Sequence, residues 1–165
     1  MLKKIKDAIE KNGFFLSTFK ENKDFLQHLL NVNEPNSETK AYAKSILKDF
    51  GLLSDKLHLV FEDFAKGDSI CLHTHLTPCD FQILIWAHEK NFIGREFVYG
   101  KKKSLIKFKP SFGDICFMKT NDLDFVHGVE RLESDSRVRT LLISYNYTGK
   151  LGEHLTIDSD QMSPV

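Results

Sequence analysis

The spacing of apolar residues changes near residue 56, and this change divides the chain into two parts. In the first part, Leu2, Ile5 and Ile9 recur at helical spacing, and the pattern stops at Asn12-Gly13. This spacing predicts an amphipathic helix over residues 2–11. The apolar run FFLSTF, at residues 14–19, predicts a strand after that helix.

Two further helical stripes follow before residue 56. One begins after Asn22, a residue type that caps helix N-termini, and the other follows NEPNS at residues 33–37. Their apolar positions are Phe25, Leu26, Leu29 and Leu30 in the first stripe and Tyr42, Ile46, Leu47 and Phe50 in the second. Residues 1–55 are therefore expected to form a mainly helical N-terminal region.

From residue 57 onward, short runs rich in β-branched and aromatic residues are separated by turn residues. The runs are LHLVFEDF, SICLHTH, FQILIWA, REFVY, SLIKFK, DICFMK, FVHGVE and RVRTLLISYNY. About eight strands at this spacing predict a mainly β sandwich or jelly roll with the helices packed outside it. We expect one domain over residues 1–165, with a jelly-roll core at 56–147 and a polar tail at 148–165.

Composition narrows the classes of partner. Lysine plus arginine equals aspartate plus glutamate, at 23 each, so no overall field attracts nucleic acid or an anionic membrane. No apolar stretch has the length of a membrane span, and the N-terminus lacks the apolar core of a secretory signal. The three cysteines form no CxxC pair, which suits a reducing compartment. We therefore expect a cytoplasmic protein with neither a nucleic-acid nor a membrane partner.

Two histidines stand one residue apart in the predicted strand SICLHTH. Alternate side chains of a strand share a face, so Ser69, Cys71, His73 and His75 are expected to point the same way. The two imidazoles would then be about 6.5 Å apart at the backbone, close enough to converge on one ion.

Two later strands carry further polar residues among apolar ones. His127 shares a face with Phe125 and Val129, and Arg137 and Arg139 share one with Leu141 and Ile143. If these faces line the interior, a metal and an anionic ligand would satisfy the buried histidines and arginines. The alternative places His73 and His75 on a solvent face and pairs the arginines with Glu130, Glu133 or Asp135.

The chain from Gly13 to about Tyr147 resembles the 2-oxoglutarate and iron(II)-dependent oxygenases, whose double-stranded β-helix is a jelly roll. AIEKNGFFL is similar to their entry helix and first strand, and PSFGDICF, FVHGV and RVRTLLI are similar to the pattern of their second half. The resemblance implies that His127 is the distal iron ligand. It also implies that Arg137, ten residues later, binds the far carboxylate of 2-oxoglutarate. Arg139 is the second candidate for this role, because it shares the face of Arg137.

The first half departs from that family's H-x-D pattern, which completes a triad of two histidines and one carboxylate. Neither His73-Thr74-His75 nor His75-Leu76-Thr77 contains an acid. The acid is either absent, replaced by a second histidine, or supplied by Asp80. GDSICLHTHLTPCD is similar instead to the first metal motif of the cupins, which share the jelly roll.

Three functions follow from these patterns. The first is an iron(II)- and 2-oxoglutarate-dependent oxygenase that hydroxylates a small-molecule substrate, with His127 and His73, His75 or both holding the metal. The second is a cupin-type isomerase, lyase or cosubstrate-free dioxygenase that uses Asp80. The third is a non-catalytic jelly-roll binding module. Because the exposed edge strands of a jelly roll can pair with another chain, we also expect a homodimer.

Overall fold

The computed structural model describes residues 1–88, 96–135, 138–149 and 155–156, and its elements follow the predicted order. The helices are α1 (Leu2–Asn12), α2 (Lys23–Asn31) and α3 (Ser37–Asp49). The strands are β1 (Phe14–Thr18), β2 (Leu57–Phe64), β3 (Ile70–His73), β4 (His75–Leu76), β5 (Phe81–Ala87), β6 (Phe97–Lys101), β7 (Ser104–Phe108), β8 (Asp114–Met118), β9 (Phe125–Val129), β10 (Val138–Tyr145) and β11 (Leu155–Thr156). The predicted strand at residues 69–75 is divided at Thr74 into β3 and β4.

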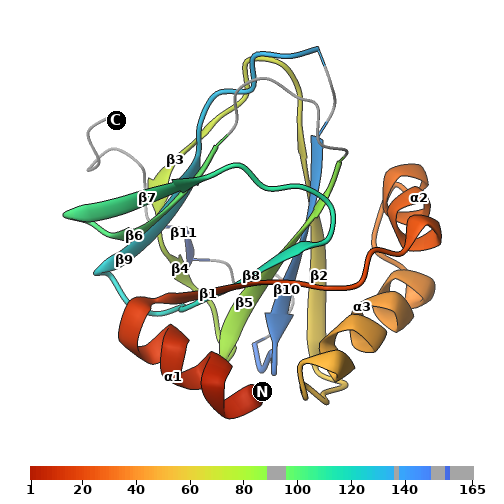
Figure 1. Ribbon diagram of the computed structural model, residues 1–165, viewed down its shortest axis with the longest axis horizontal. Coiled ribbons are helices and arrows are strands. Elements are labelled where there is room, and N and C mark those ends of the chain that lie inside the picture. Colours follow the sequence, from red (N-terminus) through yellow and green to blue (C-terminus); the bar gives the residue numbers. More distant parts are fainter. Residues whose placement is uncertain (89–95, 136–137, 150–154, 157–165) are drawn as a thin grey trace.

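The strands form two antiparallel sheets that face each other (Figure 1). The major sheet has the order β1-β8-β5-β10-β2, and the minor sheet has the order β3-β9-β6-β7. β4 pairs separately with β11, which lies in the segment predicted as a polar tail. The prediction of a mainly β jelly roll with helices outside it is therefore confirmed.

The central strands β5 and β10 of the major sheet are buried on both faces. In β5, Ile83 and Ile85 pack into the cluster that the helices cover, whereas Leu84 and Trp86 pack toward the minor sheet. All seven positions of β5 are buried. This double burial explains why every residue of FQILIWA except Gln82 is apolar, instead of polar residues alternating with apolar ones.

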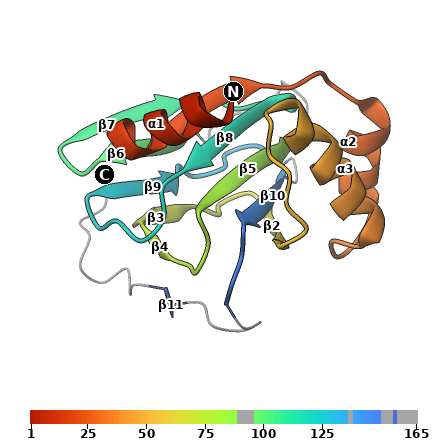
Figure 2. The same ribbon diagram turned by 90° about the horizontal axis from the view of Figure 1, so that it is seen from below.

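The helices cover the face of the major sheet that points away from the minor sheet. α1 contacts β1 and β8, while α2 contacts β5 and β10 with α3 beside it (Figure 2). The predicted cap of α2 is present, since the Asn22 side chain accepts hydrogen bonds from the backbone N–H groups of Asp24 and Phe25 at 3.0 and 3.1 Å. Among the described residues, no helix has the length and apolar character that crossing a bilayer requires.

Candidate metal centre

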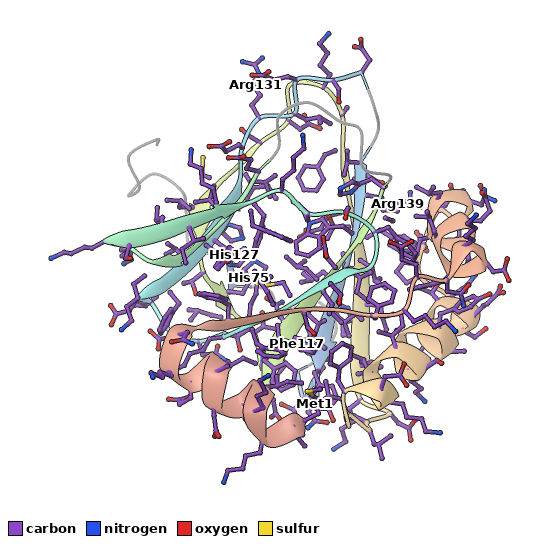
Figure 3. The ribbon with its side chains drawn as sticks, viewed as in Figure 1. Met1, His75, Phe117, His127, Arg131 and Arg139 are labelled. Atoms are coloured by element: carbon purple, nitrogen blue, oxygen red, sulfur yellow. The ribbon has the colours of Figure 1, made fainter. Side chains whose placement is uncertain are left out.

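Three histidines from different strands meet between the two sheets. His73 ends β3, His75 begins β4 and His127 is the central residue of β9. Their ligand nitrogens all lie within 4.8 Å of one another, and no other such group of three or more metal-ligating side chains occurs among the described residues. Figure 3 shows His75 and His127 close together in the space between the sheets. The structure thus brings together three of the residues that the sequence singled out.

A bulge in β3 turns His73 toward this space. Ile70 is paired with Val129, and His73 is paired with His127, so β3 has one more residue than β9 between the two pairs. As a result Ile70 and His73, three positions apart, both line the same cavity, whereas Cys71 is exposed. The predicted common face of Cys71 and His73 is wrong because strand alternation is interrupted between Ile70 and His73.

Hydrogen bonding orients the His73 ring. Its Nδ1 lies 2.9 Å from the Cys71 carbonyl oxygen, which can only accept, so Nδ1 carries the proton. Its Nε2 is then free of a proton in the neutral ring, and it lies 2.7 Å from Nε2 of His75. Two lone pairs would repel at this distance, so the pair requires either a shared proton or a cation. This donor arrangement fits a metal ion.

The connection between β8 and β9 holds the segment that carries His75. The backbone N–H of Asn121, a residue with φ of 60°, donates to the His75 carbonyl oxygen at 2.8 Å. The hydroxyl of the buried Thr74 donates to the Asp122 carbonyl oxygen at 3.1 Å. The chain is therefore fixed at the break between β3 and β4 and at the first residue of β4.

The histidines lie in surroundings that favour neutral imidazoles. Burial lowers the pKa of His127 well below its ordinary value, and the neighbouring His73 and His75 lower it further. Burial also lowers the pKa of His73, although its hydrogen bond to the Cys71 carbonyl opposes this effect. Neutral imidazole is the form that binds metal ions.

The cavity beside the histidines is small and mostly apolar. Its volume is about 20 Å³, which is close to the space that one water molecule occupies. Its walls are Glu62, Ile70, Leu84, Trp86, Phe97, Val129, Thr140 and Leu142, together with the three histidines. Glu62 is the one carboxylate among these lining residues, and none of them is lysine or arginine. Pattern reasoning missed Glu62, although its place in the alternation of LHLVFEDF was a usable signal.

Arg139 does not lie beside the histidines. Its side chain is on the helix-covered face of the major sheet, and Figure 3 shows it toward α2. The guanidinium group makes two hydrogen bonds to the carboxylate of Asp63, at 2.7 and 2.9 Å, and donates to the Leu29 carbonyl oxygen at 2.8 Å. The expected placement of Arg139 in the interior with the histidines is therefore corrected, because β10 turns Thr140 and Leu142 toward the cavity.

Two other predicted site residues are not part of this cluster. Arg137 lies outside the described residues. Asp80 is exposed and accepts a hydrogen bond from the side chain of Asn146 at 2.9 Å, and it does not belong to the group of ligand atoms formed by the histidines. Within the described residues, the group of ligand atoms consists of three histidines and contains no carboxylate.

Comparisons with known proteins depend on structure alone. No family model matches the chain, and no curated protein matches it either. A prolyl-4-hydroxylase from Pseudomonas putida is similar with a TM-score of 0.68 and 13% identity, over 90% of this chain and 96% of its own. A 2OG-Fe(II) oxygenase family oxidoreductase from Burkholderia pseudomallei gives a TM-score of 0.66 and 12% identity, over 90% and 92%.

A third similar structure has a metal in it. HygX from Streptomyces hygroscopicus, with iron bound, has a TM-score of 0.60 and 10% identity, over 88% of this chain and 87% of its own. HygX has also been solved with nickel and 2-oxoglutarate bound. Identities this low establish a common fold and do not transfer an activity. Over most of its length, the chain has the double-stranded β-helix fold of the 2-oxoglutarate and iron(II) oxygenases, as its sequence patterns predicted.

Proposed function

We propose that the protein is a non-haem iron(II) oxygenase that uses 2-oxoglutarate to hydroxylate a small-molecule substrate. The observation that carries the proposal is the meeting of His73, His75 and His127 between the sheets of this fold. Iron(II) bound by imidazoles, with coordination positions left open, supplies the oxidation chemistry. The cytoplasmic location and the homodimer stay predictions.

The chain's own residues would hold and shield the metal. His73 presents Nε2 to the site because its Nδ1–H is held by the Cys71 carbonyl oxygen. The apolar side chains of Trp86 and Phe97 exclude water from one side of the cavity, since both are about 1% exposed. Water exclusion strengthens the interactions of a bound cation with its ligands and limits side reactions.

The fit to 2-oxoglutarate is weaker than the fit to the metal. A cavity of about 20 Å³ has no room for a five-carbon diacid unless its walls move. Its one acidic wall residue, Glu62, would repel a dianion when ionised. The proposal for this cosubstrate therefore depends on Arg137 and on the fold shared with HygX.

A second candidate function is a cosubstrate-free metal enzyme of the cupin type. Two observations favour it: the third histidine in place of a carboxylate, and the small cavity without a described basic residue. The sequence predicts Asp80 as the acid of this function, but Asp80 is exposed and bonded to Asn146. We therefore propose this candidate with the three histidines as the metal ligands.

Anaerobic reconstitution with iron(II), followed by titration of 2-oxoglutarate, separates these functions. The oxygenase proposal predicts one iron per chain, loss of iron in His127→Ala, and oxygen-dependent formation of succinate that is lost in Arg137→Met. Iron bound without any uptake or turnover of 2-oxoglutarate would favour the cupin-type function. Absence of stoichiometric metal would leave the non-catalytic binding module and would refute both metal functions.

A further inference from the structure

Gly128, the residue after His127, lies against the bulge that orients His73. A Cβ atom built at Gly128 would be 2.7 Å from the Ile70 carbonyl oxygen and 3.2 Å from the Cys71 carbonyl oxygen. Real Cβ atoms essentially never lie as close as the first of these distances. The absence of a side chain at residue 128 is therefore what lets the two strands approach at this point.

Space, and not backbone conformation, explains why this residue is glycine. Gly128 is not among the residues with positive φ, so its backbone angles are open to other amino acids. It is paired with Val98 of β6 on one side and faces the extra residue of β3 on the other. A substitution would act mainly by pushing β3 away from β9.

Of the two carbonyl groups that lie against Gly128, the one of Cys71 also holds the His73 ring. The Cys71 carbonyl oxygen is part of the bulge, and its distance to Nδ1 of His73 is 2.9 Å. The bulge also brings Ile70 and His73 to the same side of β3, which regular alternation would not do. One close approach of two backbones thus sets both the direction and the tautomer of a metal ligand.

We infer that Gly128 is a positioning residue of the metal centre, acting through the bulged backbone at Cys71 on the orientation of His73. This inference rests on the proposed metal site. Groups that hold a metal-bound histidine by its second nitrogen affect metal affinity by about 10- to 100-fold. Gly128 does so one step further out, by leaving space for the carbonyl group that accepts the His73 proton.

The test compares Gly128→Ala with the wild-type protein, using Co²⁺ as the probe in anaerobic titrations followed by visible absorption. We expect the affinity for Co²⁺ to fall by about 10-fold or more and the absorption spectrum of the bound ion to change. Asn22→Ala is the matched control, because it removes the cap of α2, far from the histidines, and so lowers stability without touching the site. It should lower Tm and leave Co²⁺ affinity unchanged.

A second measurement does not depend on the variant folding. Long-range ¹H–¹⁵N correlation spectra of the metal-free wild-type protein report which nitrogen of each histidine carries the proton. We expect Nδ1–H for His73, and a protonated Nε2 with a bare Nδ1 would overturn the inference. Equal Co²⁺ affinity and identical spectra for wild type and Gly128→Ala would also overturn it, while the metal site itself would stand. Failure of the wild-type protein to bind Co²⁺ would instead count against the proposed function.

Discussion

Replacing Arg139 with methionine should destabilise the protein without weakening the metal centre. The guanidinium group pairs with both oxygens of Asp63 and donates to the carbonyl oxygens of Leu29 and Val32, where α2 ends. It also lies over the ring of Phe61, 4.5 Å from the ring centre. Methionine keeps an apolar stem and most of the volume but removes the charge and every hydrogen bond of the guanidinium group.

The size of this effect follows from the burial of the two partners. The Arg139 side chain is 5% exposed, whereas the side chain of Asp63 is 34% exposed. Removing one partner of a fully buried ion pair costs about 3–5 kcal/mol, and partial solvation of Asp63 puts this case at the lower end, about 3 kcal/mol. For a chain of this length, a loss of that size lowers Tm by roughly 6–12 °C.

The assay is urea denaturation of Arg139→Met and wild type, with Co²⁺ titration of each folded protein. Arg131→Met is the control for the loss of a positive charge, because Arg131 is exposed and should change stability by less than about 0.5 kcal/mol (Figure 3). Co²⁺ affinity should stay the same in both variants. Unchanged stability together with loss of 2-oxoglutarate binding in Arg139→Met would refute this reasoning and return Arg139 to a role in the cosubstrate site.

Three further predictions concern the site and its surroundings. Thr74→Val removes the hydroxyl that donates to the Asp122 carbonyl oxygen. Urea denaturation should show a free energy of unfolding lower by about 1–2 kcal/mol, and titration should show weaker Co²⁺ binding. No change in either quantity would contradict the role of this bond. A divalent metal ion at 100 times its Kd should stabilise the wild-type protein by about 2.7 kcal/mol, measured as a rise in Tm. His127→Ala should abolish this rise, and an equal rise in that variant would mean that the metal binds elsewhere. The exposed Cys71 should react with a thiol reagent in the native protein, as mass spectrometry of the labelled chain would show. Cys116, whose pKa burial raises strongly, should react only after unfolding, and the opposite order of labelling would contradict this prediction.

Local patterns determined most of the secondary structure. Helical spacing ending at Gly13, a capping residue at Asn22 and apolar runs of strand length correspond to α1, α2 and the strands of both sheets. The boundaries of β2 and β5 agree with the runs LHLVFEDF and FQILIWA residue for residue. These features depend on neighbouring residues and on burial of one or both faces, which the order of residue types records.

The histidines of the candidate site were also visible in the sequence, because a pair two residues apart and a third on a later strand is uncommon inside apolar runs. Their convergence was not visible, since it depends on which strands pair. His73 is opposite His127 only because β3 and β9 are neighbours in the minor sheet.

The faces of the strands were decided by tertiary structure alone. Alternation fixes which residues share a face but not which face is inside, and a buried strand has two inside faces. Arg139 went to the helix side of β10, where the end of α2 and Asp63 satisfy its charge. One extra residue in β3, accommodated by Gly128, reversed the alternation before His73. The sequence by itself determined the elements and the candidate ligands, whereas strand pairing and a single close backbone approach decided which side chains meet.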